Sequence, residues 1–244
     1  MAEISTFLKS LGKAESDLFD LTHVRGRNPD APHDGGHFAV RGTTRPLSVS
    51  PIESRLLYNL VTLAQAKSVI ELGTGFGYSA AWIAAALSQN VPGGKLLTID
   101  DWSEGEGLSK NKKTAISLWE RLGLMDVICP LTGHSPSIFG NIDYSTFDIA
   151  FIDGEHRNGQ PLIDYLEISM RMNPRGMIIF HDVQEKYDVI EAVEAARRDG
   201  YILFPINSSC NPVVAYKADG IDQLISCAIY LAEKGCLAYR QNHD

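Results

Sequence analysis

The segment Val69–Ser79 constrains the fold of this 244-residue chain more than any other part of it. It runs from an apolar stretch through Glu71 into three glycines at alternate positions, G-x-G-x-G, and then into the helix-forming residues 80–87. A strand followed by a glycine turn and a helix brings the backbone close to a nucleotide-like ligand in α/β proteins. The segment therefore predicts a Rossmann-like sheet with a ligand site at the end of one strand.

The spacing of the glycines and the charge beside them indicate which ligand the turn accepts. Gly73, Gly75 and Gly77 depart from the G-x-G-x-x-G fingerprint, which cradles the pyrophosphate of a dinucleotide. Glu71 precedes the first glycine by two positions, where a carboxylate would repel a pyrophosphate and attract a cation. S-adenosylmethionine carries a sulfonium and an amino group, so the segment favours this cofactor over NAD.

Composition argues against several other classes of protein. The chain has 22 Lys and Arg against 30 Asp and Glu, a net charge of −8, and this acidic balance argues against a nucleic acid partner. Its four cysteines match no zinc-ligand spacing and indicate a reducing compartment. The N-terminus lacks a signal-peptide pattern, and no stretch reaches the ~18 apolar residues of a membrane span. We expect a cytoplasmic protein with no membrane partner.

Strands and helices alternate along most of the chain. Alternation of this kind implies an α/β fold with a doubly wound, mostly parallel sheet and helices on both faces. Two C-terminal strands separated by a polar loop resemble an antiparallel pair, so we expect seven strands, one of them an antiparallel edge strand. The expected strands are 68–72, 95–100, 127–131, 147–153, 176–182, 201–206 and 212–217. One expected helix begins at Pro51, and the other expected helices span 79–88, 109–122, 159–172, 186–199 and 221–239.

Three parts follow from this pattern. Residues 1–46 combine an amphipathic helix with a loop rich in Gly, Pro, Arg and His, which is typical of a substrate-side loop or lid. Residues 47–217 form the predicted cofactor-binding domain. Residues 218–244 form a C-terminal helical appendage.

Titratable residues end four of the predicted parallel strands, where ligands of such sheets bind. These residues are Glu71, Asp100, Asp153 and the pair His181-Asp182. Asp100 lies on the strand after the glycine turn, where a carboxylate can accept two hydrogen bonds from a ribose diol. We therefore predict that Asp100 binds the ribose of the cofactor.

Two further segments have more than one reading. Asp101 and Trp102 follow the ribose strand, and Trp102 suits either stacking on adenine or packing in the core. His134 and Ser135 follow the third strand, where Ser135 suits either a hydrogen bond to the adenine edge or the cap of the next helix. The sequence leaves both choices open.

The segment 152–156 carries the predicted chemistry. His156 lies on a loop after a strand, and an imidazole titrating near neutrality can remove a hydroxyl proton. Glu155 is a second candidate base. Asp153, His181 and Asp182 could surround Mg²⁺, or Mn²⁺ if the imidazole takes part. Alternatively, Asp182 caps the following helix and His181 packs nearby.

Over residues 46–217 the chain resembles class I S-adenosylmethionine-dependent methyltransferases. Within that class it is most similar to the small-molecule O-methyltransferases related to catechol and caffeoyl-CoA O-methyltransferases. The resemblance rests on Val69–Ser79 as the first cofactor motif, on Leu97–Asp100 as the ribose strand, and on Phe147–Asp153 as the strand whose terminal aspartate binds metal in that family. It implies methyl transfer to a hydroxyl of a small molecule, such as a phenol, a sugar or another natural product.

The resemblance also implies roles for residues beyond the motifs. His156 stands where catechol enzymes have a lysine base, and His181-Asp182 stands where the family usually has Asp-Asn or Glu-Asp. Terminal helices of such proteins often pack in homodimers. The predicted cofactor-binding residues are Glu71, Gly73, Thr74, Gly75, Gly77, Tyr78, Ser79, Asp100, Asp101, Trp102, His134, Ser135 and Asp153. The predicted catalytic residues are His156, Glu155 and Asp153, and the predicted metal ligands are Asp153, His181 and Asp182.

Three other functions stay open on the sequence alone. A metal-independent small-molecule N-methyltransferase fits the same motifs and would keep its activity in a strong chelator. An NAD-dependent oxidoreductase would bind NADH in place of S-adenosylhomocysteine, although the G-x-G-x-G spacing and Glu71 argue against it. A non-catalytic cofactor-binding protein could share the same fold.

Overall fold

The computed structural model describes residues 49–90, 92–102, 108–142, 146–184, 187–208 and 210–238. The predicted N-terminal helix and loop lie outside these ranges. The predicted C-terminal helix, 221–239, ends at Glu233, and residues 234–238 that follow it are not helical.

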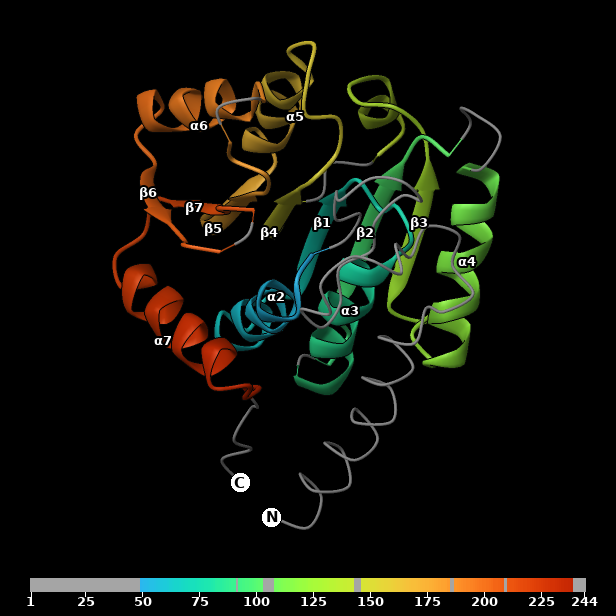
Figure 1. The fold of residues 1–244 in the computed structure, drawn as a ribbon. Coiled ribbons are helices and arrows are strands. Elements are labelled where there is room, and N and C mark those ends of the chain that lie inside the picture. The colour runs from blue at the N-terminus through green and yellow to red at the C-terminus, as the bar shows by residue number, and fades with distance from the viewer. Residues whose placement is uncertain are drawn as a thin grey trace, which may run out of the picture.

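A seven-stranded sheet forms the centre of the fold, in the order β3-β2-β1-β4-β5-β7-β6 (Figure 1). Neighbouring strands are parallel except at β7, which runs antiparallel to both β5 and β6. The predicted fold class is confirmed. The antiparallel strand is β7, which is the second strand from the edge, and β6 forms the edge itself. The strands are β1 (Ser68–Leu72), β2 (Lys95–Asp100), β3 (Ile128–Thr132), β4 (Phe147–Ile152), β5 (Met172–Phe180), β6 (Ile202–Pro205) and β7 (Val213–Tyr216).

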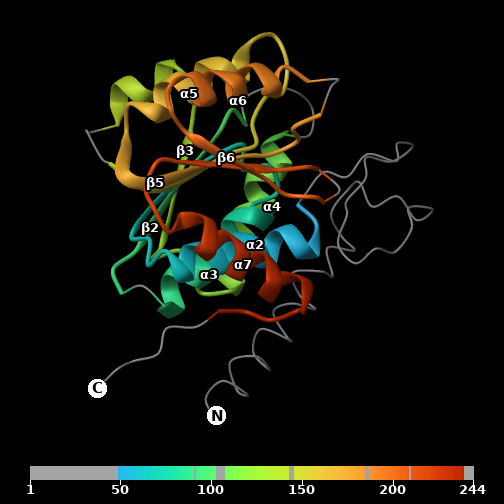
Figure 2. The same cartoon turned by 90° about the vertical axis from the view of Figure 1, so that its left-hand side faces the viewer.

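Helices cover both faces of the sheet (Figure 2). One face carries α2 (Pro51–Leu63), α3 (Tyr78–Asn90), α4 (Leu108–Arg121) and α7 (Ile221–Glu233), and the other carries α5 (Gln160–Ser169) and α6 (Val189–Arg198). A short 3₁₀ helix, η1 (Ser137–Asn141), follows β3. Each face has its own apolar core, with Trp82 and Trp119 buried in one and Tyr165 and Ile168 in the other. Burial of apolar area on both faces is the main force holding such a three-layer fold together.

The first turn of α2 is fixed by a capping box, as Ser50 and Pro51 predict. The Ser50 hydroxyl accepts a hydrogen bond from the Glu53 backbone N–H at 3.2 Å, and the Glu53 carboxylate accepts one from the Ser50 N–H at 2.7 Å. The other oxygen of Glu53 accepts hydrogen bonds from the Ser208 hydroxyl at 2.5 Å and the Cys210 N–H at 3.3 Å. The buried Glu53 carboxylate therefore ties the start of α2 to the loop between β6 and β7.

Strand β5 begins earlier than the sequence predicts. Residues 173–176 read as a turn because they contain Pro174 and Gly176, yet the structure places them inside β5. Met172 pairs with Phe147, and the register then shifts before the regular pairing resumes at Met177. An irregular stretch of this kind tolerates a proline, because it leaves backbone groups outside the ladder.

The third glycine of the turn is confined by α4. Gly77 has φ +78°, and a Cβ there would lie 2.7 Å from both Ala115 and the ring of Trp119. The indole N–H of Trp119 donates to the Gly77 carbonyl oxygen at 2.8 Å. The turn and α4 are thus packed together through a position that only glycine fits.

We predict that Gly77→Ala lowers the free energy of unfolding by about 2–3 kcal/mol, because it combines a left-handed backbone with a collision in the core. Urea unfolding of the ligand-free protein measures the loss. Gly93→Ala is the matched control, since Gly93 has φ +77° and a Cβ added there would meet no atom within 4 Å. The control should lose only about 1 kcal/mol. Equal losses in the two variants would contradict the packing argument.

Candidate active site

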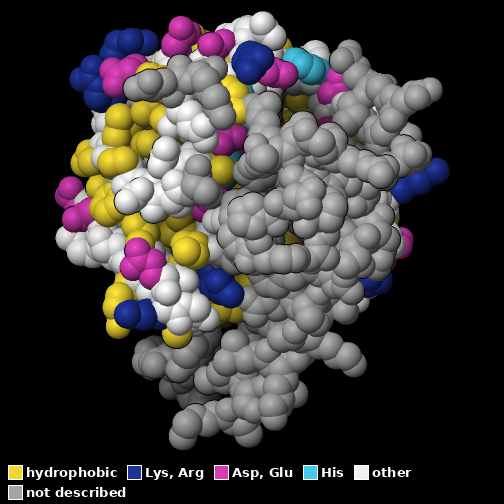
Figure 3. Space-filling model, viewed as in Figure 1, with side chains coloured by type: hydrophobic (Ala, Val, Ile, Leu, Met, Phe, Trp, Pro, Cys, Tyr) yellow, Lys and Arg dark blue, Asp and Glu magenta, His cyan; other side chains and the backbone are white. Residues whose placement is uncertain are grey.

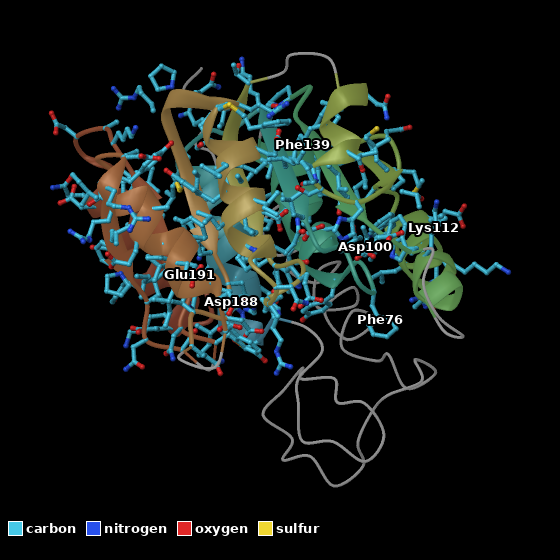
Figure 4. The ribbon with its side chains drawn as sticks, turned by 90° about the horizontal axis from the view of Figure 1, so that it is seen from above. Phe76, Asp100, Lys112, Phe139, Asp188 and Glu191 are labelled. Carbon is cyan, nitrogen blue, oxygen red and sulfur yellow. The ribbon has the colours of Figure 1, made fainter. Side chains whose placement is uncertain are left out.

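A cavity of about 790 Å³ opens at the carboxyl ends of the parallel strands. Figure 4 looks down on this end of the sheet and shows Asp100 at the same edge as Phe76 of the glycine turn and Lys112 of α4. Most of the predicted site residues line one continuous cavity. They are Gly73, Thr74, Gly75, Tyr78, Ser79, Asp100, Asp101, His134, Ser135, Asp153, Glu155, His156, His181 and Asp182.

The glycine turn lies between the ends of β2 and β4. Gly73 has φ +93°, and a Cβ at this position would collide with the backbone carbonyl of Asp153. Gly75 donates its N–H to the Asp100 carboxylate at 2.8 Å. The two glycines therefore allow one turn to contact both strand ends that carry predicted ligand-binding carboxylates.

Asp100 lies at the end of β2, with its carboxylate in the cavity wall. Its partial burial raises its pKa, and the hydrogen bonds from the backbone of Gly75 and Thr74 act in the opposite direction. The carboxylate is held by the turn while facing the cavity. Its binding of a ribose diol stays a prediction.

Glu71 lies beneath the turn and is not among the residues that line the cavity. It is fully buried, and its carboxylate accepts hydrogen bonds from the hydroxyls of Ser79 and Thr98, both at 2.5 Å. Burial raises its pKa to about 7, against the lowering effect of the two hydroxyls. The Glu71 carboxylate thus links the first turn of α3 to β2. The glycine turn separates this carboxylate from the cavity.

Trp102 packs against the back of the glycine turn. Its indole N–H donates to the Gly75 carbonyl at 3.3 Å, and its ring is buried, with the Lys112 ammonium 5.0 Å from the ring centre. Trp102 is not among the cavity-lining residues. Of the two roles that the sequence left open, the structure favours packing over stacking on adenine.

The opposite wall contains a buried polar group that the sequence reading missed. Gln160 of α5 donates through its side-chain amide to the Ser135 carbonyl at 3.1 Å and to the Asp164 carboxylate at 2.7 Å. Asp164 lines the cavity, and its burial raises its pKa. The sequence offered one signal of this group, because Asp164 lies next to Tyr165 on the side of α5 that is buried with Pro161.

His156 lies between two carboxylates at the opening of the cavity. Its Nε2 is 3.2 Å from Asp153 Oδ1 and 3.7 Å from Asp182 Oδ2, and its ring packs on Tyr187 with 5.0 Å between ring centres. Asp182 has φ +54°, a left-handed conformation that costs energy in residues other than glycine. Glu155, the other candidate base, is exposed and accepts a hydrogen bond from the Arg157 N–H at 3.0 Å. His156 is thus held between two carboxylates, whereas Glu155 is exposed.

His181 lies deeper, between the carboxylates of Asp153 and Glu53. Its Nδ1 is 2.9 Å from Asp153 Oδ1, and its Nε2 is 3.6 Å from Glu53 Oε2. Burial alone would lower the His181 pKa, but the charge of Asp153 and the contact with its carboxylate, with Cys210 and Glu53 nearby, raise it well above its usual value. In turn, the positive imidazole holds the pKa of Asp153 and of Glu53 below their usual values despite burial. Glu53 and Cys210 gave no sign of this role in the sequence.

The predicted metal ligands Asp153, His181 and Asp182 come together. Their donor atoms lie within 4.8 Å of one another. These separations suit neighbouring ligands of one divalent ion, and two carboxylates with an imidazole match the donors of Mn²⁺, or of Mg²⁺ when water completes the coordination. Asp153 Oδ1 lies 3.2 Å from His156 Nε2 and 2.9 Å from His181 Nδ1. Metal binding by this cluster stays a prediction.

Comparison with known proteins identifies the class. A family model described as a methyltransferase domain matches residues 70–183. The chain is 32% identical to the catechol O-methyltransferase of Niastella koreensis over 162 residues, which cover 62% of this chain and 68% of that protein. It is 26% identical to the catechol O-methyltransferase of Mycobacterium tuberculosis over 136 residues, 56% of each protein. The chain belongs to the class I S-adenosylmethionine-dependent O-methyltransferases.

Solved structures share the fold. The O-methyltransferase of Bacillus cereus in complex with SAH gives a TM-score of 0.63 at 20% identity, covering 84% of this chain and 91% of that one. The O-methyltransferase TomG of Streptomyces achromogenes in complex with SAM gives 0.57 at 21% identity, covering 71% and 82%. The fold predicted from the strand and helix pattern is confirmed by both.

Two further predictions concern the rest of the chain. Cys129, Cys210, Cys227 and Cys236 form no disulfide bond in the structure. Within the described ranges, none of the helices has both the length and the apolar character that crossing a membrane requires.

We predict that Asp100→Ala weakens S-adenosylhomocysteine binding about 10- to 100-fold, the range expected when hydrogen bonds to a charged group are lost. Isothermal titration calorimetry measures the affinity. The control is Asp126→Ala, which removes an exposed carboxylate near the start of β3 that does not line the cavity. Unchanged affinity in Asp100→Ala would remove this residue from the cofactor site.

Glu71 should make stability depend on pH. Its folded-state pKa of about 7 exceeds the usual 4.5, so the folded protein holds this proton more tightly than the unfolded chain. The resulting stability is complete below pH ~4.5 and is lost as the pH rises to about 7, by about 3 kcal/mol. Glu71→Gln should abolish this component, and urea unfolding at pH 5 and pH 8 tests it. Glu120→Gln, on the exposed face of α4, should leave the pH difference unchanged, and the same difference in wild type and Glu71→Gln would contradict the assignment.

Proposed function

We propose that this methyltransferase acts on a hydroxyl of a small phenol, sugar or related natural product, with His156 as general base. The observation that carries the proposal is the position of His156 between Asp153 and Asp182, in the same cavity as the glycine turn. The names of the relatives, catechol O-methyltransferases, support a phenolic acceptor.

The proposed reaction is an in-line displacement at the sulfonium methyl of S-adenosylmethionine. Gly73, Gly75 and Asp100 would hold the cofactor, and the acceptor oxygen would approach the methyl along the line of the breaking carbon–sulfur bond. The acceptor loses its proton to the base, the new carbon–oxygen bond forms, and S-adenosylhomocysteine leaves with the electron pair. Alignment of the two reactants supplies much of the acceleration in such reactions.

The environment of His156 suits proton removal. A neutral imidazole has one donor and one acceptor nitrogen. With Nε2 directed at the Asp153 carboxylate, Nδ1 becomes the nitrogen that takes the acceptor proton. The charge that then develops on the ring is stabilised by Asp153 and Asp182, and the Tyr187 ring supports its orientation.

Acceptor identity is tested by methyl transfer from labelled S-adenosylmethionine to matched pairs of small molecules, such as a catechol and the corresponding aminophenol. We expect label on oxygen. Label on nitrogen alone would favour an N-methyltransferase, and calorimetric binding of NADH without binding of S-adenosylhomocysteine would favour an oxidoreductase. If none of the small molecules is methylated while the cofactor binds normally, the result would favour a non-catalytic protein.

We predict that His156→Ala lowers kcat by about 10²- to 10⁴-fold, the usual contribution of a general base, and leaves the affinity for S-adenosylhomocysteine unchanged. Steady-state rates and calorimetry measure the two effects. Glu155→Gln is the discriminating variant, because it removes the neighbouring candidate base. A larger loss in Glu155→Gln than in His156→Ala would transfer the role to Glu155.

We also infer a cytoplasmic location, which four cysteines without a disulfide bond support. The absence of nucleic acid or membrane partners stays a prediction, as does the division into 1–46, 47–217 and 218–244. The predicted homodimer is supported by exposed hydrophobic side chains on the face shown in Figure 3, over the part of the molecule where β6 and α7 lie. Ile202 and Tyr230 on these elements are 51% and 59% exposed.

A further inference from the structure

The cavity wall formed by α5 contains a buried carboxylate that the proposed reaction does not use. Asp164 is 2% exposed and lines the cavity, and the Gln160 side-chain amide donates to its Oδ1 at 2.7 Å. Within the described ranges, Gln160 is the one residue that donates a hydrogen bond to this carboxylate. A carboxylate has about four acceptor positions and is costly to bury when few of them are used. Asp164 is therefore suited to accept a hydrogen bond from a ligand.

A buried hydroxyl lies beside this carboxylate. Ser135 lines the cavity, and its Oγ is buried without a hydrogen-bond partner among the described residues. Burial raises the pKa of Asp164, and the Ser135 side chain is close enough to act against that rise. The Ser135 carbonyl oxygen is already occupied, since it accepts from Gln160 at 3.1 Å and lies 2.6 Å from His134 Nδ1. The unpaired hydroxyl costs free energy until a ligand supplies its partner.

Gln160 determines how the two groups face the cavity. Its side-chain nitrogen contacts both the Ser135 carbonyl and Asp164 Oδ1, so one amide joins the loop after β3 to α5. Because Oδ1 is directed at Gln160, Oδ2 is the oxygen left for a ligand. Oδ2 lies 3.5 Å from the position that a Cβ would take at Gly154, which also lines the cavity. The missing side chain at Gly154 leaves space beside Oδ2.

The place of this pair in the cavity indicates which part of S-adenosylmethionine meets it. The strand order β3-β2-β1-β4 puts the end of β2, with Asp100, between the glycine turn after β1 and Ser135 after β3. With the ribose at Asp100, the methionine end lies toward β1 and β4, and the base is left for the β3 side. Ile99 lines the cavity there and belongs to the apolar core under α5, so it offers a surface for a flat ring.

The polar edge of adenine has the pattern of hydrogen bonds that this pair requires. Its 6-amino group only donates, and the ring nitrogens on either side of that group only accept. A carboxylate oxygen beside a hydroxyl can accept from the amino group and donate to a neighbouring nitrogen. A purine with a carbonyl oxygen at position 6 would instead place that oxygen against the carboxylate.

We propose that Asp164 and Ser135 recognise the adenine edge of S-adenosylmethionine. Asp164 Oδ2 accepts from the 6-amino group, Ser135 Oγ donates to a neighbouring ring nitrogen, and Gln160 is the positioning residue that orients the carboxylate. This assigns a role to Asp164 and Gln160 and chooses between the two roles that the sequence leaves open for Ser135. The inference goes beyond the proposed function, because it concerns the cofactor and is independent of the acceptor.

The first test compares two ligands on the wild-type protein. Isothermal titration calorimetry on the full chain measures the affinity for S-adenosylhomocysteine and for S-inosylhomocysteine, which has a carbonyl oxygen in place of the 6-amino group. We expect S-adenosylhomocysteine to bind at least 10-fold more tightly, because a buried acceptor left facing a carbonyl loses its partner. Equal affinities would overturn the proposal.

The second test reverses the preference. In Asp164→Asn, the side-chain oxygen can still accept from Gln160, and an amide N–H₂ takes the place of Oδ2. This group opposes the 6-amino group and matches a carbonyl oxygen. We expect the affinity for S-adenosylhomocysteine to fall at least 10-fold and the affinity for S-inosylhomocysteine to rise. Equal losses for both ligands would show a structural role for Asp164, and unchanged affinities with a raised KM for the acceptor would assign it to the acceptor. Either result would overturn the proposal.

Two further variants test the neighbours of Asp164. Ser135→Ala should weaken S-adenosylhomocysteine binding severalfold, and unchanged affinity would remove Ser135 from the adenine site. Gln160→Ala should narrow the preference between the two ligands, because the carboxylate loses its fixed orientation. An equal loss for both ligands would make Gln160 merely structural.

Controls separate these outcomes from other failures. Asp126→Asn removes an exposed carboxylate outside the cavity and should keep the wild-type preference. If Asp164→Asn fails to fold, the wild-type comparison and Ser135→Ala decide the question. All these measurements are made without an acceptor, apart from the KM, so a failure of the proposed hydroxyl methylation would leave them interpretable.

Discussion

The close approach of the β1 turn to the end of β4 is the constraint on which the site depends. Because Gly73 has no side chain, its backbone lies against the Asp153 carbonyl, and the Gly75 N–H reaches Asp100 on the other side. One turn thus brings the Asp100 carboxylate after β2 and the Asp153 carboxylate after β4 to the same cavity. A larger residue at Gly73 would separate the two halves of the site.

Much of the fold could be predicted because local pattern and tertiary role agree. The bounds of β1 and β2 follow from short apolar runs with an acidic residue at or next to their carboxyl end, and the start of α2 follows from the Ser50–Glu53 capping box. Prediction was weaker at β5, where Pro174 and Gly176 are normal turn residues. The register shift against β4 accommodates them, and that shift depends on a partner strand distant in sequence.

The sequence could predict which residues form the candidate site, but not which partners they contact. The sequence placed Asp100, Asp153 and His156 at one sheet edge, because parallel strands end together. It could not show that Glu71 points beneath the turn toward Ser79 and Thr98, since one strand position reveals nothing about hydrogen-bond partners on other elements. Nor could it pair Glu53 with His181, because that contact forms only when α2 packs beside the β5 end.

The capping box of α2 has a consequence beyond helix formation. One Glu53 oxygen accepts from the Ser50 N–H and lies beside His181, while the other holds Ser208 and Cys210. The carboxylate that starts a helix therefore also lies beside His181, which lines the cavity. Substitutions in the first turn of α2, or in the β6–β7 loop, can reach the chemistry without touching cofactor or acceptor.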